Sequence, residues 1–149
     1  MLKPNAILHN LKTSSKKHAL QKIADIVARD TNTDERIVME QLHEREKLGS
    51  TGMGSGVAIP HARLQSIDQV YTVFVTLDHS IDFDAVDEKP VDIIVALLAP
   101  HDAGADHLQA LASISRLLRD QKFCDKIRGA QDEDAIESLL LNYQRAKAA

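Results

Sequence analysis

The sequence of 149 residues is poor in the residue types that mark several classes of protein. Its one cysteine, Cys124, excludes an internal disulfide and a zinc site built on cysteines. Aromatic residues make up only 3% and tryptophan is missing, which argues against a stacking platform for single-stranded nucleic acid. The net charge of −4, with scattered lysines and arginines, argues against a protein that mainly neutralises nucleic-acid phosphates.

Long apolar segments are missing as well. No run reaches the roughly 18 residues of a membrane span, and Met1–Asn5 lacks the apolar segment of a signal peptide. We therefore expect no nucleic-acid partner, no membrane insertion and a cytoplasmic location. The 44% of apolar and 27% of charged residues are typical of a globular protein, and the length predicts a single domain over residues 1–149.

Apolar residues recur at helical spacing in several stretches. Residues 14–30 form one such helix, with Ser14 or Ser15 as its cap. A second helix is predicted to begin with Thr33 as N-cap and to end near Gly49, since glycine favours the position after a helix. Three more helices are predicted at residues 106–120, at residues 122–128 and from about Asp132.

Strand patterns occupy the middle of the chain. Val57–His61 is a short apolar strand stopped by Pro60, and Val70–Leu77 is rich in β-branched and aromatic residues. Val91–Ala99 is almost continuously apolar, which indicates a central strand buried on both faces. The predicted order is two helices, then strands, then three helices. This order predicts a mixed sheet with helices packed on it, and no repeated βαβ unit of a Rossmann or flavodoxin-like fold.

The most informative segment is Gly49–Gly56, which holds four of the six glycines. Glycines allow successive N–H groups to point inward as an anion nest, and hydroxyl groups add donors. Arg45 precedes the segment and can offer a guanidinium fork to phosphate oxygens. His61 follows it and supplies a nitrogen nucleophile near neutral pH. The segment predicts a phosphate cradle beside a histidine, with Ser50, Thr51, Gly52 and Gly54 as candidate phosphate-binding residues.

Two familiar nucleotide motifs do not fit this segment. A P-loop needs Gly-x-x-x-x-Gly-Lys-Ser/Thr, which is absent. The Gly52-x-Gly54-x-Gly56 spacing is wrong for a dinucleotide fingerprint, and it follows a helix rather than a strand. The glycine cluster taken alone is also compatible with a plain surface loop.

Together with its flanks, the segment resembles the active-site signature of the mannitol/fructose-type enzyme IIA proteins of the bacterial phosphoenolpyruvate:sugar phosphotransferase system. The matching residues are Arg45-Glu46, Gly49-Ser50-Thr51-Gly52, Gly54, Gly56 and Ala58-Ile59-Pro60-His61. The resemblance continues through Pro90-Val91-Asp92 and His107-Leu108-x-x-Leu111 and covers nearly the whole chain. It is strongest to the nitrogen-regulatory members, although Ala62 departs from the Gly or Cys often found after the histidine.

The resemblance implies an α/β fold: a single domain with a mixed β-sheet of about five strands and helices packed on both faces. It also implies that His61 is the phosphoacceptor, through Nε2 as a tele-phosphohistidine. Its phosphoryl donor would be an HPr-type phosphocarrier, in this subgroup an NPr-like one. His107 would assist, and Arg45 and the loop around Ser50 and Thr51 would stabilise the charge. No cofactor is implied.

The function that the resemblance implies is that of a regulatory phosphotransferase component, whose phosphorylation state controls partners such as transporters or sensor kinases. One alternative is a sugar-specific IIA protein that passes the phosphoryl group to a IIB domain. Another is a non-catalytic anion- or metabolite-binding module. We expect no metal, because His101 and His107 lie six residues apart across a loop-to-helix boundary. The downstream targets, the oligomeric state and a role of His101 in the site stay open.

Overall fold

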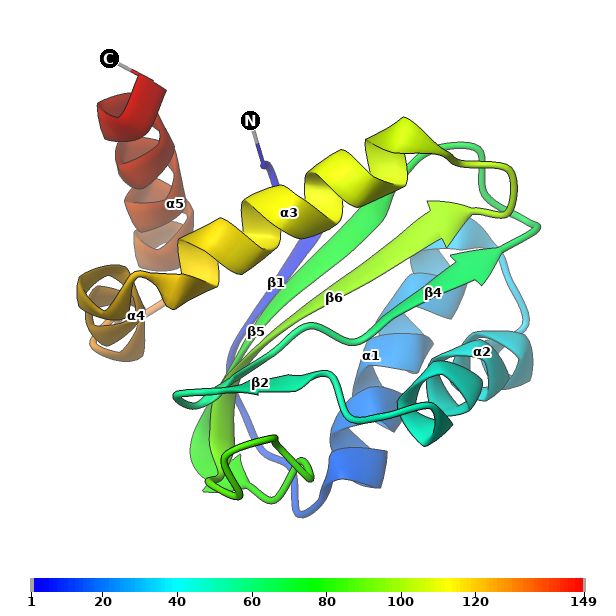
Figure 1. Cartoon of the computed structure of the whole chain (residues 1–149), viewed down its shortest axis with the longest axis horizontal. Helices are drawn as coiled ribbons and strands as arrows, with labels where there is room; N and C mark the ends of the chain where they lie inside the picture. The colour runs from blue at the N-terminus through cyan, green and yellow to red at the C-terminus, as the bar shows by residue number, and fades with distance from the viewer. Residues whose placement is uncertain (1, 149) are drawn as a thin grey trace.

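The computed structural model describes residues 2–148, in which six strands and five helices form an α/β arrangement (Figure 1). The strands are β1 (Ala6–Leu11), β2 (Gly52–Gly54), β3 (Val57–Ala58), β4 (His61–Leu64), β5 (Tyr71–Ile81) and β6 (Val91–Pro100). The helices are α1 (Lys16–Thr31), α2 (Glu35–Lys47), α3 (Ala105–Arg119), α4 (Gln121–Arg128) and α5 (Glu133–Ala148). None of the helices within residues 2–148 combines the length and apolar character needed to cross a bilayer.

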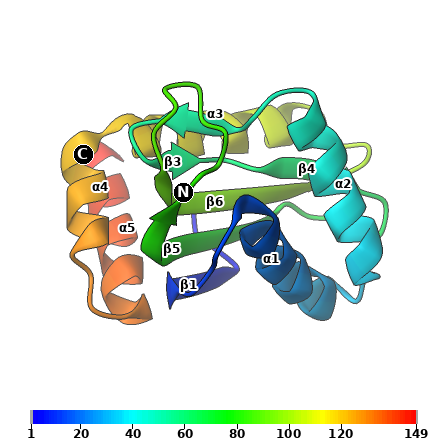
Figure 2. The same ribbon diagram turned by 90° about the horizontal axis from the view of Figure 1, so that it is seen from below.

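The strands form one mixed sheet in the order β1-β5-β6-β3-β2. Strand β1 runs parallel to β5, and β5 runs antiparallel to β6. Strands β3 and β4 both pair in parallel with β6, one after the other, so that Val57 lies opposite Ile93 and His61 opposite Leu97 (Figure 2). The mixed sheet expected from the sequence is confirmed.

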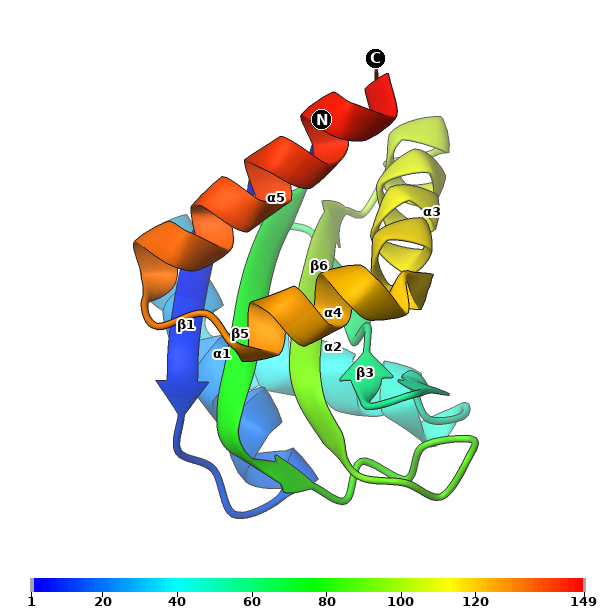
Figure 3. The same cartoon turned by 90° about the vertical axis from the view of Figure 1, so that its left-hand side faces the viewer.

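Helices cover both faces of the sheet. Figure 3 shows α3, α4 and α5 in front of the strands, with α1 and α2 behind them. Each layer of helices encloses its own apolar cluster against the sheet, and β5 and β6 contribute to both clusters. The two-sided burial explains why Val91–Ala99 is almost continuously apolar, and it confirms the central strand and the packing of helices on both faces.

At the N-termini of the first two helices, one capping prediction is confirmed and one is wrong. Ser15 caps α1 by accepting a hydrogen bond from the His18 N–H group. The prediction of Thr33 as the N-cap of α2 was wrong, because Asp34 accepts from the Arg36 N–H group. The Thr33 hydroxyl instead bonds the hydroxyls of Thr31 and Ser66. The helix therefore begins one residue later than expected.

Four short strands differ from the sequence prediction. Strand β1 was missed, because its six residues include the polar His9 and Asn10 and show no clear alternation. Strand β2 lies inside the glycine segment, where only a loop was expected. The single strand predicted for residues 57–61 is two strands, because Pro60 has no N–H group and the Ile59 N–H donates to the Thr51 carbonyl (3.1 Å).

Candidate functional site

His61 is the first residue of β4, and its hydrogen bonds define its tautomer. The Nδ1 atom lies 2.9 Å from the Ile59 carbonyl oxygen, which can only accept, so Nδ1 carries the proton. The Nε2 atom lies 3.2 Å from Nε of Arg45, which can only donate, so Nε2 carries the lone pair. The nitrogen available for nucleophilic attack is therefore Nε2.

The surroundings of His61 favour the neutral ring. Burial is the main cause that lowers the pKa of His61, and the nearby Arg45 guanidinium lowers it further. The hydrogen bond to the Ile59 carbonyl and the charge of Glu46 oppose this shift. A neutral ring keeps the Nε2 lone pair that a nucleophile needs at neutral pH.

Arg45 belongs to the last turn of α2 and connects this helix to the histidine. Its Nη1 atom donates to the Gly49 carbonyl oxygen (2.8 Å), while Nε donates to His61. The two bonds fix the plane of the guanidinium beside Nε2. A bidentate donor in this position suits an anion that arrives at that nitrogen.

His107 lies in the first turn of α3 and is buried, with its ring centroid 6.1 Å from that of His61. Burial lowers the pKa of His107, with smaller contributions from Arg63 and His61. Its Nδ1 atom has no hydrogen-bond partner among residues 2–148. The structure thus brings together His61, Arg45 and His107, the three side chains that the resemblance placed in one site.

The loop before α3 is held by Arg63 of β4. Its Nη1 atom donates to the carbonyl oxygens of His101 (3.0 Å) and Ala103 (2.9 Å), and this anchors the start of the helix that carries His107. The His101 side chain is exposed and does not line the cavity beside His61. No group of three His, Cys, Asp or Glu side chains that could hold a metal ion is found in residues 2–148.

The polar groups at the start of the glycine loop bond within the protein, which differs from the free donors expected there. The Ser50 hydroxyl donates to the Phe83 carbonyl oxygen (2.7 Å) and accepts from the Gly52 N–H group (3.0 Å). The Thr51 N–H and hydroxyl both donate to the Glu46 carboxylate. These bonds make residues 50–52 a preformed wall of the site.

The far end of the glycine loop is fixed by two charged side chains. The Asp87 carboxylate accepts from the Ser55 N–H group (3.0 Å), and this bond is the main cause that lowers the pKa of Asp87. Arg128 of α4 donates from Nη2 to the Ser55 carbonyl oxygen (3.0 Å) while its guanidinium pairs with Asp92 of β6. The loop is therefore bonded to the connection between β5 and β6 and to α4.

A cavity of about 510 Å³ lies between the glycine loop and α3. His61, Arg45 and the loop, including Gly54, form one wall, and Leu111, Leu118 and Arg119 belong to the helix opposite. Sequence reasoning missed Arg119, since a basic residue in the last turn of a helix is expected from the helix dipole alone. The cavity combines the half-buried His61 ring with two guanidinium groups and an apolar rim.

Comparison with known proteins gives concordant results. A family model described as "Phosphoenolpyruvate-dependent sugar phosphotransferase system, EIIA 2" matches residues 1–143. A nitrogen regulatory protein from Bradyrhizobium diazoefficiens is 51% identical over 140 residues, which cover 94% of this chain and 92% of that protein.

Solved structures share the fold. The nitrogen regulatory protein IIA-Ntr from Neisseria meningitidis superposes with a TM-score of 0.85 at 31% identity, covering 91% of this chain and 92% of that one. The mannitol IIA protein from Escherichia coli gives a TM-score of 0.75 at 19% identity, covering 90% of this chain and 94% of that one. The likeness to the mannitol protein extends to the arrangement of helices and strands.

Proposed function

The chain belongs to the EIIA 2 family of the phosphoenolpyruvate-dependent sugar phosphotransferase system, and we propose that it is a phosphohistidine carrier with a regulatory role. In this proposal His61 accepts a phosphoryl group on Nε2 from an HPr-type phosphocarrier of the NPr-like kind. The observation that carries the proposal is the tautomer of His61, whose Nε2 lone pair faces Arg45 while Nδ1–H is bonded to a carbonyl oxygen.

The transfer step follows from this geometry. The Nε2 lone pair of His61 attacks the phosphorus atom, and the bond between phosphorus and the donor imidazole nitrogen breaks with its electron pair returning to the donor. The His61 ring becomes cationic as the new bond forms, and its Nδ1–H group then donates more strongly to the Ile59 carbonyl oxygen. Positioning and charge stabilisation therefore dominate the chemistry.

Arg45 is the main stabilising group in this step. Its Nε atom, 3.2 Å from Nε2 of His61, transfers its hydrogen bond from the nitrogen to an oxygen of the arriving phosphoryl group. His107, with its ring centroid 6.1 Å from that of His61, assists as a neutral imidazole. Because Ser50, Thr51 and Gly52 already have partners in the protein, we assign them the shaping of the cavity rather than the first contact with the phosphate.

A regulatory role is supported by the relatives. Proteins named nitrogen regulatory protein cover more than 90% of this chain at 51% and 31% identity. Phosphorylation adds about two negative charges at one surface position, which suffices to change the affinity for a partner. We propose that cytoplasmic partners such as transporter or sensor-kinase domains distinguish the two forms of the protein.

Mass spectrometry of the intact protein tests the proposal. Incubation with phosphoenolpyruvate, enzyme I and an HPr-type carrier is expected to add one phosphoryl group, labile in acid and stable in alkali. The His61→Ala variant is expected to stay unmodified, whereas His43→Ala, which removes an exposed histidine on α2, is expected to react like the parent. Full labelling of the His61→Ala variant would overturn the assignment.

A second experiment separates regulation from sugar transport. The phosphorylated protein is mixed with fructose- or mannitol-type IIB domains, and loss of its phosphoryl group is followed over time. We expect slow or no transfer to these domains. A pull-down with the phosphorylated and unphosphorylated forms is expected to capture different partners. An unmodified protein that binds phosphorylated metabolites would instead favour a non-catalytic binding module.

A further inference from the structure

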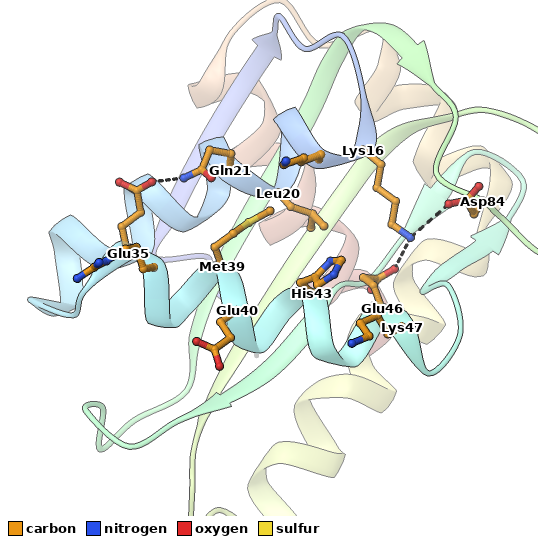
Figure 4. Close-up of a pocket in the computed structure, with 12 residues that line it drawn as sticks. Lys16, Leu20, Gln21, Glu35, Met39, Glu40, His43, Glu46, Lys47 and Asp84 are labelled. Carbon is orange, nitrogen blue, oxygen red and sulfur yellow. Dashed lines mark hydrogen bonds and ion pairs between the residues drawn. The ribbon is translucent and has the colours of Figure 1, made fainter.

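A groove between α1 and α2 contains a largely buried ion pair that is connected to the glycine loop (Figure 4). The groove has a volume of about 700 Å³ and lies outside the cavity that holds His61. In it, Nζ of Lys16 from α1 lies 2.9 Å from Oε1 of Glu46 from α2. Lys16 is also 3.8 Å from Asp84 and 4.7 Å from the centre of the Phe83 ring, so its head group is held from several sides.

Glu46 is unusual for its place in the helix. It lies in the last turn of α2, where the negative end of the helix dipole disfavours a carboxylate, and only 8% of its surface is exposed. A buried carboxylate at this point needs several donors to offset the cost of its burial. Besides Lys16, these donors are the N–H group (3.1 Å) and the hydroxyl (2.6 Å) of Thr51.

The hydrogen bonds of Glu46 continue to the reactive ring. The Thr51 carbonyl oxygen accepts from the Ile59 N–H group at 3.1 Å. The Ile59 carbonyl oxygen in turn accepts from Nδ1 of His61 at 2.9 Å. A series of polar contacts, linked through the backbones of Thr51 and Ile59, therefore runs from Lys16 in the groove between α1 and α2 to the nitrogen that sets the tautomer of His61.

We propose that Lys16 and Glu46 are positioning residues for phosphoryl transfer, which act by holding Thr51 and thereby the Ile59 carbonyl that orients His61. This inference rests on the proposed function of His61 as phosphoacceptor. The ion pair keeps the carboxylate turned inward, since a carboxylate without a cation at this depth is better solvated when it turns toward the groove. When the carboxylate turns outward, Thr51 loses both of its bonds to Glu46, and the Ile59 carbonyl is no longer fixed.

The geometry argues that the pair does more than join α1 to α2. Both carboxylate oxygens of Glu46 bond Thr51, and only 4% of the side chain is exposed. An ion pair that only joined two helices would need no contact with the loop. The ion pair and the loop contact share one carboxylate, so the position of Lys16 is coupled to the site.

The variants Lys16→Gln and Glu46→Gln test this proposal. Lys17→Gln is the matched control, because it removes the same charge from the next residue of α1, which lines the same groove but is exposed. Lys16→Arg serves as the conservative variant that keeps the cation. The tautomer of His61 is read from imidazole ¹⁵N chemical shifts of the unphosphorylated protein, and kcat and KM are measured for transfer from the HPr-type carrier.

We expect Lys16→Gln and Glu46→Gln to show a mixture of the two neutral His61 tautomers and a kcat lowered by about 10-fold, with KM nearly unchanged. Lys17→Gln is expected to match the parent, and Lys16→Arg to recover most of the kcat. The parent tautomer or the parent kcat in both glutamine variants would overturn the proposal. If the parent itself accepted no phosphoryl group, the proposed function would be wrong. The comparison of His61 tautomers would still test whether Lys16 and Glu46 orient the ring. Because Glu46→Gln conserves shape, it keeps the test open if Lys16→Gln does not fold.

Discussion

The Nε atom of Arg45 lies 3.2 Å from the Nε2 atom of His61, the nitrogen that carries the lone pair of the ring. In the proposed phosphoryl transfer, negative charge would arrive directly beside this guanidinium. The guanidinium stays in that position through its second bond, from Nη1 to the Gly49 carbonyl oxygen (2.8 Å). The donor is thus already oriented before a partner binds.

Replacing Arg45 with alanine should therefore slow phosphorylation of His61. By analogy with a single oxyanion donor, we expect the rate of transfer to fall on the order of 10²-fold. The measurement is rapid-quench kinetics with a phosphorylated HPr-type carrier. Arg36→Ala is the control, since this arginine lies on the same helix with 91% of its side chain exposed and its guanidinium pairs with Asp34. Transfer at the parent rate by Arg45→Ala would remove this arginine from the site.

The histidines of the site should also make stability depend on pH. Burial lowers the pKa of both His61 and His107 from the ordinary value of 6.5. Below that pH the unfolded chain binds protons that the folded chain does not, so the free energy of unfolding falls as the pH decreases toward the folded-state values. Each ring adds a slope of at most about 1.4 kcal/mol per pH unit, and this slope disappears only well above pH 6.5, where the unfolded ring is also neutral.

Urea denaturation between pH 7.5 and pH 5 (roughly the range in which imidazoles titrate) measures this effect. The His61→Gln variant is expected to lose less stability over the range than the parent, because its side chain takes up no proton in either state. NMR titration of the parent should place the midpoint of His61 below 6.5. An equal loss of stability in the two proteins would contradict the burial of a neutral ring.

Arg63 is expected to act on His107 without touching it. Substitution by glutamine removes the two bonds to the carbonyl oxygens of His101 and Ala103 and removes a positive charge that lowers the pKa of His107. The pKa of His107 should be higher in Arg63→Gln than in the parent. The difference between the two proteins should become smaller in high salt, because salt screens the Arg63 charge in the parent. NMR titration checks this, with Arg116→Gln on α3 as the control. A salt-independent change would point to rearrangement of α3 instead.

The sequence made much of this site predictable, because the chemistry is concentrated in a short segment. The glycines, Arg45 and His61 lie within 17 residues, a helix and a strand frame them, and a family resemblance assigns their roles. The apolar run of β6 likewise identifies a central strand, since no other environment suits so many consecutive buried residues. Such local patterns can be recognised without knowing how distant parts of the chain pack.

Other features depend on contacts that a linear pattern does not contain. The Ser50 and Thr51 hydroxyls suggest free donors, yet each has a partner that only the fold brings near, Phe83 for one and Glu46 for the other. The position of Glu46 is the one local sign of such a contact, because an acidic residue is disfavoured in the last turn of a helix. The edge strand β1 has no clear strand pattern in its sequence, because its pairing with β5 compensates for a weak local preference.

Gly56 offers a test of how firmly the glycine loop must be held. Its φ of +83° disfavours any side chain, and a Cβ atom there would lie 2.6 Å from Nη2 of Arg128. We expect Gly56→Ala to lower the free energy of unfolding by about 1–2 kcal/mol through backbone strain, and further by displacing Arg128 from Asp92 and from the Ser55 carbonyl oxygen.

Urea denaturation measures the stability of this variant, and the kinetics of His61 phosphorylation measure its function. Gly129→Ala is the matched control, because its φ of −87° suits alanine and the nearest atom to an added Cβ is 3.6 Å away. The control should stay within about 0.5 kcal/mol of the parent and transfer phosphate at the parent rate. In Gly56→Ala the displaced Arg128 no longer anchors the loop end, so the cavity wall shifts and transfer slows as well. Parent stability and rate in Gly56→Ala would mean that the loop accommodates a side chain, and Arg128 would then have no part in shaping the site.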